Sequence, residues 1–218
     1  VIYLQHHLQN QINPDLKFKL KPKWLLEVGV GDYNVCRSKY FWKTAFCYLF
    51  EPHPSYYLDL IFRTNSLPNI KIYNIAITDK IGTGFLYLKN NCSFIEQDDT
   101  IFEDKKIFAE DEILIKFPVM TSRISNFDKG NYDVLFLDTE GSEWWCIKNL
   151  ISRPLFISVE MRIGNDKNKY TNEILNWLEE NNYIKLSESN DKNDDFFIKK
   201  NVMDNPDRYF DRIEITNE

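Results

Sequence analysis

Three carboxylates lie close together in the segment FLDTEGSEWW, which covers residues 136–145. Asp138, Glu140 and Glu143 directly follow the apolar run VLFL, which is typical of a buried strand. Removing a carboxylate from water costs free energy unless the group is paired, hydrogen-bonded or used in a reaction. Glu143 has a structural explanation, because the first turn of the helix predicted to follow favours an anion. Asp138 and Glu140 have none, so they are candidate functional groups.

Two earlier apolar runs also end in residues that suit a ligand. The run WLLEV leads into Gly29 and Gly31, which permit a tight turn and a close approach of a ligand to the backbone. The run FCYLF ends before Glu51, whose carboxylate can accept two hydrogen bonds from a ribose diol. A dinucleotide fingerprint would need a third glycine where the chain has Asn34. The glycine turn and Glu51 together favour a ribose-binding site.

A third run, IKIYNI, contains Asn74 and is followed by Ala76 and Asp79. A small residue beside an amide leaves room for a flat adenine ring and offers hydrogen bonds to its edge. A strand that ends in an ordinary Asp turn is the alternative interpretation of this segment.

These segments belong to an alternation of short apolar runs and helical patterns. Such repetition, with nearly continuous apolar strands, predicts an α/β fold with a Rossmann-like, open, mostly parallel seven-stranded sheet and helices on both faces. The last two strands have no helix between them, so we expect an antiparallel closing pair. The expected strands are 24–28, 46–50, 70–75, 133–137, 155–160, 183–186 and 196–198, with extra strands at 83–88 and 118–125 and helices at 35–43, 54–65, 142–151 and 171–182.

The chain length favours a single domain over residues 1–218, with an N-terminal extension at 1–23, a core at 24–200 and a polar tail at 201–218. Ligands of such open sheets bind at the carboxyl ends of the strands, which is where the acidic segments lie.

Composition excludes several classes of protein. Hydrophobic residues make up 43% of the chain, so it is not disordered, and the net charge of −6 argues against general nucleic-acid binding. The four cysteines form no C-x-x-C pair and the chain has three histidines, so a zinc site is not expected. Scattered cysteines favour a reducing, cytoplasmic location. No apolar run approaches the ~18 residues of a membrane span.

The strand ends, in this order, resemble those of class I S-adenosylmethionine-dependent methyltransferases, and more narrowly those of the FkbM family. The matching segments are LEVGVG, FEPHPSYYL, NIAITD, LDTEGSE and ISVE, and NNYIKL…DDFFIKK resembles the family's closing strands. The similarity covers residues 24–200. The resemblance implies that the cofactor contacts Glu27, Gly29, Val30 and Gly31 at its methionine and ribose end, Glu51 and Pro52 at the ribose hydroxyls, Asn74 and Ala76 near adenine, and Asp138 near the sulfonium.

The resemblance implies O-methylation, with a hydroxyl of a sugar, a glycan or a related small molecule as the acceptor. A hydroxyl nucleophile must lose its proton, and a carboxylate in a partly dry crevice is suited to accept it. Asp138 and Glu140 are the first candidates for this general base, and Glu160, at the end of the ISVE strand, is a third.

Asp138 and Glu140 would also suit a divalent metal that prefers oxygen ligands. Two carboxylates are too few to define such a site, so a metal is not favoured. The polar segment 89–117 is a candidate acceptor loop, in which Asn90, Asn91 and Ser93 can hydrogen-bond sugar hydroxyls.

Two other functions fit part of the pattern. A nicotinamide-dependent oxidoreductase shares the glycine turn and Glu51, but it lacks the third glycine and leaves the DTEGSE segment unexplained. A non-catalytic domain that binds a nucleoside would have the same strand ends without turnover.

Overall fold

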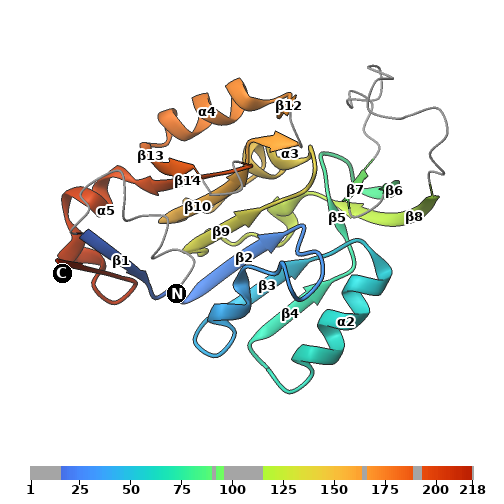
Figure 1. Cartoon of the computed structure of the whole chain (residues 1–218), viewed down its shortest axis with the longest axis horizontal. Coiled ribbons are helices and arrows are strands. Elements are labelled where there is room, and N and C mark those ends of the chain that lie inside the picture. The colour runs from blue at the N-terminus through green and yellow to red at the C-terminus, as the bar shows by residue number, and fades with distance from the viewer. Residues whose placement is uncertain (1–15, 90–91, 96–114, 164–165, 189–192, 218) are drawn as a thin grey trace.

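A computed structural model of the chain describes residues 16–89, 92–95, 115–163, 166–188 and 193–217. Its centre is a seven-stranded sheet with the strand order β13-β14-β10-β9-β2-β3-β4 (Figure 1). The seven strands are β2 (Trp24–Val28), β3 (Phe46–Phe50), β4 (Ile70–Tyr73), β9 (Val134–Leu137), β10 (Phe156–Glu160), β13 (Tyr183–Glu188) and β14 (Asp194–Lys199). The predicted α/β class and the seven-stranded sheet are confirmed.

The sheet is mixed. Strands β4, β3, β2, β9 and β10 run parallel to one another. Strand β14 runs antiparallel to both β10 and β13. The predicted closing strands correspond in part to β13 and β14, which extend further in the structure, with a register irregularity between Lys185 and Ser187.

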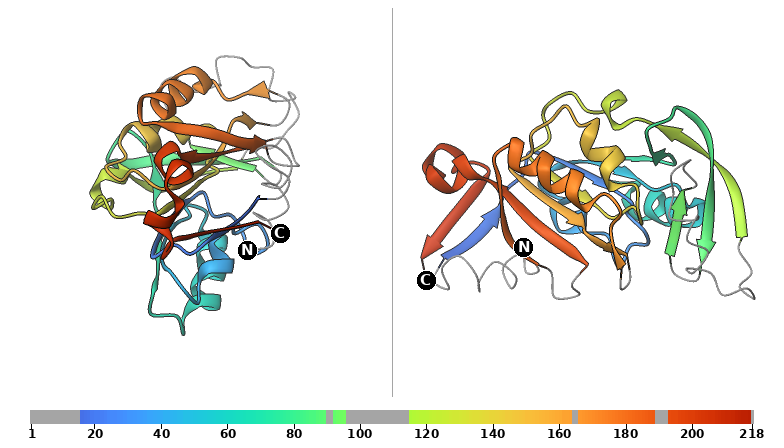
Figure 2. Two further views of the ribbon diagram at one scale, coloured as in Figure 1. Left: turned by 90° about the vertical axis from the view of Figure 1, so that its left-hand side faces the viewer. Right: turned by 90° about the horizontal axis from the view of Figure 1, so that it is seen from above.

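Helices cover both faces of this sheet, which explains why its strands are apolar on successive residues. In β2, Leu25 belongs to one hydrophobic cluster and Leu26 to the other. Helices α3 (Glu143–Lys148) and α4 (Thr171–Glu180) pack on the Leu26 side, whereas α2 (Pro54–Thr64) and α5 (Lys200–Asp204) pack on the Leu25 side. Figures 1 and 2 show α3 and α4 on the opposite side of the sheet from α2.

The helix predicted over 35–43 is reduced to a short 3-10 turn, η1 (Ser38–Phe41). The cause is local: the backbone N–H groups of Arg37 and Ser38 donate to the Glu27 carboxylate at 2.8 and 2.9 Å. A side chain from the preceding strand therefore holds the chain where a longer helix would have begun.

A second sheet stands beyond the carboxyl ends of the central strands, with the order β5-β8-β6-β7 (Figure 1). Its strands are β5 (Ala76–Ile77), β6 (Gly82–Lys89), β7 (Cys92–Ile95) and β8 (Ile115–Ser122). Strand β6 pairs antiparallel with β7 and β8. The two extra strands predicted from the sequence are therefore part of a separate sheet that lies beyond the edge where a ligand is predicted to bind.

The two ends of the described chain meet. Strand β1 (Leu16–Leu20) pairs antiparallel with β15 (Ile213–Asn217), as Figure 2 shows. The segment expected to be a polar tail thus contains α5, the turn η4 (Pro206–Tyr209) and β15, and it buries Val202 and Ile213. Short elements η3 (Ile124–Asn126), β11 (Arg162–Ile163) and β12 (Asp166–Lys167) complete the fold. Among the described residues, no helix has the length and apolar character needed to cross a membrane.

Candidate functional site

A cavity of about 200 Å³ opens at the carboxyl ends of the central strands. The second sheet closes its far side, through Leu86, Ser93 and Ile95. The predicted site residues that line it are Gly29, Gly31, Glu51, Pro52, Ala76, Asp138 and Glu140. The structure therefore brings residues from four separate strand ends to one cavity.

The turn after β2 packs directly against the loop after β9. Gly29 has a φ of 75°, and a Cβ added there would lie 1.7 Å from the Asp138 carbonyl oxygen. Gly31 has a φ of 65°, and its N–H donates to Oε2 of Glu51 at 2.7 Å. Both positions require glycine, because other residues rarely adopt a positive φ and because a side chain at 29 has no room.

Glu51 is 3% exposed and borders the cavity. Its Oε1 accepts a second backbone hydrogen bond, from His53 N–H at 2.7 Å. Burial raises the pKa of Glu51 to about 7, the two backbone hydrogen bonds oppose that rise, and the carboxylates of Glu27 and Asp138 add to it. The group therefore changes charge near neutral pH.

Three predicted cofactor contacts lie outside the cavity wall. Asn74 donates to the carbonyl oxygens of Glu51 and Pro52, both at 2.9 Å, and so fixes the segment that carries the Glu51 carboxylate. Val30 is buried in the hydrophobic cluster beside α2. Glu27 is buried beneath the glycine turn, where it accepts the hydrogen bonds of Arg37 and Ser38, and burial raises its pKa.

Arg37 is a site residue that the sequence analysis missed. Its Nη1 donates to Oδ2 of Asp138 at 2.9 Å, and its Nη2 donates to Oδ2 of Asp194 at 2.5 Å. Burial alone would lower the pKa of Arg37, but the carboxylates of Asp138, Asp194 and Glu27 raise it above its usual value. The guanidinium is therefore a fixed positive charge. No local pattern marks it, because its partners lie 101 and 157 residues away in sequence.

Glu143 anchors the loop that carries the other acidic groups. Its Oε1 accepts hydrogen bonds from the N–H and the hydroxyl of Thr139, both at 2.8 Å. Its Oε2 accepts from Gly141 N–H at 3.1 Å and from Asn168 Nδ2 at 2.6 Å. This loop holds Glu140 in a left-handed conformation, with a φ of 53°. Glu143 does begin α3, but its main contacts are with the loop.

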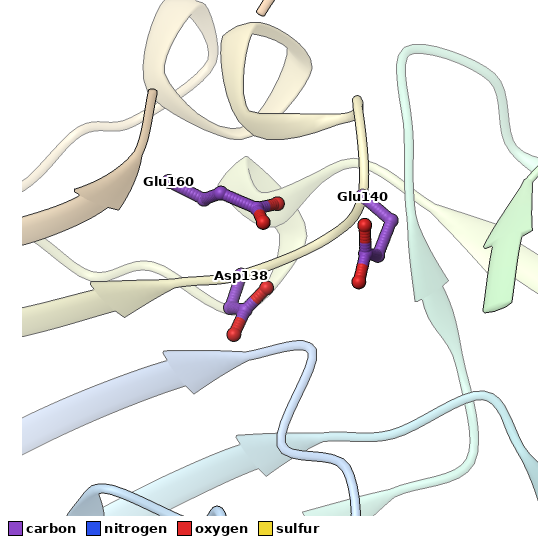
Figure 3. A group of neighbouring side chains, drawn as sticks. All are labelled: Asp138, Glu140 and Glu160. Carbon is purple, nitrogen blue, oxygen red and sulfur yellow. The ribbon is translucent and has the colours of Figure 1, made fainter. Parts of the chain in front are cut away.

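Asp138, Glu140 and Glu160 form an acidic cluster, with one carboxylate oxygen from each lying within 4.8 Å of the others. Figure 3 shows the three carboxyl groups gathered beyond the ends of β9 and β10. Glu160 is 4% exposed, and its Oε2 has no hydrogen-bond partner among the described residues. Burial raises the pKa of Glu160 well above its usual range, and the carboxylates of Asp138, Glu143 and Glu140 raise it further.

The charge of the cavity wall limits which ligands it suits. The described residues that line it include three carboxylates, of Glu51, Asp138 and Glu140, but no Lys, Arg or His. Such a wall favours a neutral or cationic ligand and repels a phosphate. Of the predicted acceptor-loop residues, Ser93 lines the cavity, whereas Asn90, Asn91 and residues 96–114 lie outside the described part of the chain.

The sequence matches the family model described as the methyltransferase FkbM domain over residues 26–185. No curated protein gives a significant match. Similar solved structures include a Methanococcus jannaschii fibrillarin pre-rRNA processing protein, with 12% identity over 83% of this chain and 68% of that one and a TM-score of 0.46. An Aeropyrum pernix fibrillarin with bound S-adenosyl-L-methionine has 11% identity over 87% and 70% of the two chains and a TM-score of 0.46. A methyltransferase from Aquifex aeolicus, described as SAM-dependent, has 12% identity over 83% of this chain and 84% of that one, with a TM-score of 0.42.

Proposed function

The chain belongs to the FkbM methyltransferase family, and we propose that it moves a methyl group from S-adenosylmethionine to a hydroxyl oxygen of a sugar, a glycan or a related small molecule. The observation that carries this proposal is the acidic cavity at the strand ends. Its wall presents the carboxyl groups of Glu51, Asp138 and Glu140, together with the glycine turn.

The cavity residues fit this cofactor. The Glu51 carboxylate is fixed by two backbone N–H groups, and further lone pairs on its oxygens can accept hydrogen bonds from ribose hydroxyls. Ala76 and Ile77 offer a small apolar surface for a flat ring. Asp138 and Glu140 supply negative charge where a sulfonium would be stabilised. A dinucleotide fits less well, because its pyrophosphate would meet these carboxylates.

S-adenosylmethionine supplies a methyl group on a positively charged sulfur. In the proposed reaction the acceptor oxygen loses its proton and forms a bond to the methyl carbon. The carbon–sulfur bond breaks, and its electron pair stays on sulfur, which becomes a neutral thioether. The chain must therefore hold the two partners in line and receive one proton.

The acidic cluster is the proposed destination of that proton. Asp138 is engaged by Arg37 through Oδ2, and Glu160 lies behind the cavity wall. Glu140 lines the cavity on a loop that Glu143 holds in place, so it is the member of the cluster best placed to meet an acceptor hydroxyl.

The proposed acceptor class rests on other groups in the wall of the same cavity. Tyr56, Ser93 and Ser142 line the same cavity. An aromatic ring face and hydroxyl groups are suited to a polyhydroxylated molecule, because they combine apolar contact with hydrogen bonding.

Isothermal titration with S-adenosylhomocysteine, with NAD as a parallel ligand, tests the cofactor. We expect binding of S-adenosylhomocysteine alone, and Glu51→Gln should weaken it by roughly tenfold through the loss of a charged acceptor. The matched control is Glu180→Gln, a change at an exposed position of α4 that should leave binding unchanged. Binding of NAD alone, or of neither ligand, would overturn the cofactor proposal.

Transfer of a labelled methyl group to a panel of sugars and nucleotide sugars tests the acceptor. The expected product carries an ether methyl group, identified by its carbon chemical shift. Methylation found only on nitrogen or carbon would contradict the proposed hydroxyl acceptor while leaving the cofactor proposal intact.

A further inference from the structure

We propose that Asp138, Glu140 and Glu160 bind a hard divalent cation, of the class of Mg²⁺, Mn²⁺ or Ca²⁺. Two of the side chains come from the loop after β9 and the third from the end of β10. Figure 3 shows their carboxyl groups lying close to one another. The sequence places Asp138 and Glu140 together, and the fold supplies Glu160 as the third ligand.

The spacing of the oxygens suits one ion. Two ligands of the same ion can lie no further apart than twice the metal–oxygen distance, which is about 4.6–5.2 Å for Ca²⁺ and about 4.0–4.2 Å for Mg²⁺. The cluster oxygens lie within 4.8 Å of one another. The spacing therefore meets the pairwise limit for Ca²⁺, and a small rotation of the Glu140 or Glu160 side chain would bring the oxygens closer around one ion.

An independent observation comes from Oε2 of Glu160. The atom is buried and has no hydrogen-bond partner among the described residues. Most buried polar atoms have a partner, because leaving one without costs free energy. A cation shared with Asp138 and Glu140 would give this oxygen its partner and would offset the repulsion within the cluster.

The surroundings of the cluster fix its ligands in the manner of known metal sites, where outer contacts orient the coordinating groups. Arg37 contacts Oδ2 of Asp138, and Oδ1 has no hydrogen bond among the described residues. Glu143 holds the loop that positions Glu140. Arg37 also neutralises part of the local negative charge, but it is shared with Asp194.

The ligand type selects the class of ion. All three groups are carboxylates, without a His or Cys among them, so hard cations that prefer oxygen are favoured over zinc or copper. Asp138 and Glu140 also line the cavity, so the remaining coordination positions would face the acceptor.

The catalytic consequence rests on the proposed function. A hydroxyl bound to the cation would lose its proton more readily, because the positive charge stabilises the resulting oxyanion. With the cation bound to the carboxylates of the cluster, the released proton would pass to water in place of Glu140, and the later bond changes would be those already described.

Electron paramagnetic resonance of added Mn²⁺, which reports the free ion, tests the site directly. We expect one Mn²⁺ site in the wild-type chain, at least tenfold weaker binding in Glu160→Gln, and unchanged binding in the exposed control Glu180→Gln. Mg²⁺ and Ca²⁺ should displace the Mn²⁺. Because Glu160→Gln replaces a buried carboxyl group, whose Oε2 has no hydrogen-bond partner among the described residues, with a neutral amide of similar shape, its thermal midpoint without metal should equal or exceed that of the wild type.

Absence of Mn²⁺ binding, or equal binding by Glu160→Gln and the wild type, would overturn the cation site. If Mn²⁺ does not bind but methyl transfer proceeds in EDTA, the cation inference fails and the proposed function stands. If Mn²⁺ binds as expected but no acceptor is methylated, the cation site stands and the proposed function fails.

Discussion

The guanidinium of Arg37 lies 2.9 Å from the carboxylate of Asp138, although 101 residues separate them in the chain. The same guanidinium reaches Asp194 through its other nitrogen. One cation thus joins the glycine turn after β2, the loop after β9 and the beginning of β14. The glycine turn and the loop after β9 both carry residues that line the cavity, so Arg37 helps to fix their relative positions.

Replacing Arg37 by methionine should destabilise the fold. The side chain is 24% exposed, and its removal takes away the guanidinium that pairs with both Asp138 and Asp194. Breaking a largely buried pair of this kind costs about 3 kcal/mol. Urea denaturation measures the loss. Arg63→Met is the matched control, because Arg63 pairs with Asp59 on the exposed surface of α2, where such pairs contribute less than about 1 kcal/mol. Equal losses in the two variants would show that the ion pairs of Arg37 stabilise the fold no more than an exposed ion pair does.

Replacing Gly29 by alanine should abolish binding of S-adenosylhomocysteine and destabilise the chain. The new Cβ would lie 1.7 Å from the Asp138 carbonyl oxygen, so the turn and the loop after β9 must separate. Gly130→Ala is the control. Gly130 has a similar φ of 81°, but a Cβ there would meet only Ile151 Cγ2, at 3.6 Å. That change should cost only the backbone strain of about 1–2 kcal/mol. Calorimetric titration and urea denaturation of both variants separate the clash from the strain, and intact binding by Gly29→Ala would contradict the predicted contact.

The affinity for S-adenosylhomocysteine should increase as the pH rises through about 7, because burial raises the pKa of Glu51 to about 7 and the ionised form is the better acceptor. The groups around it are the carboxylates of Glu27 and Asp138, which raise this pKa, and the imidazole of His53, whose own pKa is lowered by burial. Titrations at several pH values should show a total rise in affinity of roughly tenfold around pH 7, similar to the loss expected for Glu51→Gln, with little further change at higher pH. In Glu51→Gln this dependence should disappear.

The effect of pH on the stability of the fold, through Glu51, is opposite to its effect on binding. Because the folded-state pKa of Glu51 is raised above its unfolded value, the folded chain holds the proton more tightly. Its contribution to stability is therefore present at low pH and is lost as the pH rises from the unfolded pKa through about 7. Urea denaturation across this range, compared between the wild type and Glu51→Gln, measures the difference. A difference that grows in the opposite direction would contradict the assignment of this pKa.

The sequence predicted the parts of the site that depend on local pattern. Apolar runs that end in Gly29, Glu51 and Asp138 indicate parallel strands, and such strands place their carboxyl ends together. It did not predict Arg37 or the anchoring role of Glu143, because both depend on partners brought close by the fold. It also missed the pairing of β15 with β1, since short strands that join the ends of a chain have little periodicity to distinguish them from polar tail segments.

Glu140 and Glu143 allow the reactive role of the loop to be separated from its structure. Glu140→Gln removes the acidic group that lines the cavity but leaves the hydrogen bonds that hold the loop. Turnover should fall by roughly 10²–10⁴-fold, the range expected for loss of proton transfer, whereas binding of S-adenosylhomocysteine and the thermal midpoint should be nearly unchanged.

Glu143→Gln, unlike Glu140→Gln, should lower the free energy of unfolding. An amide has one acceptor oxygen, so it cannot accept all the hydrogen bonds from Thr139, Gly141 and Asn168 that the buried carboxylate accepts. The expected loss is about 1–3 kcal/mol in urea denaturation. Turnover should also fall, because Glu140 loses its fixed position, and restoring the loop with a stabilising osmolyte should recover part of it. Undiminished turnover in Glu140→Gln would contradict its role in proton transfer. Equal stability losses in both variants would contradict the role of Glu143 as the anchor of the loop.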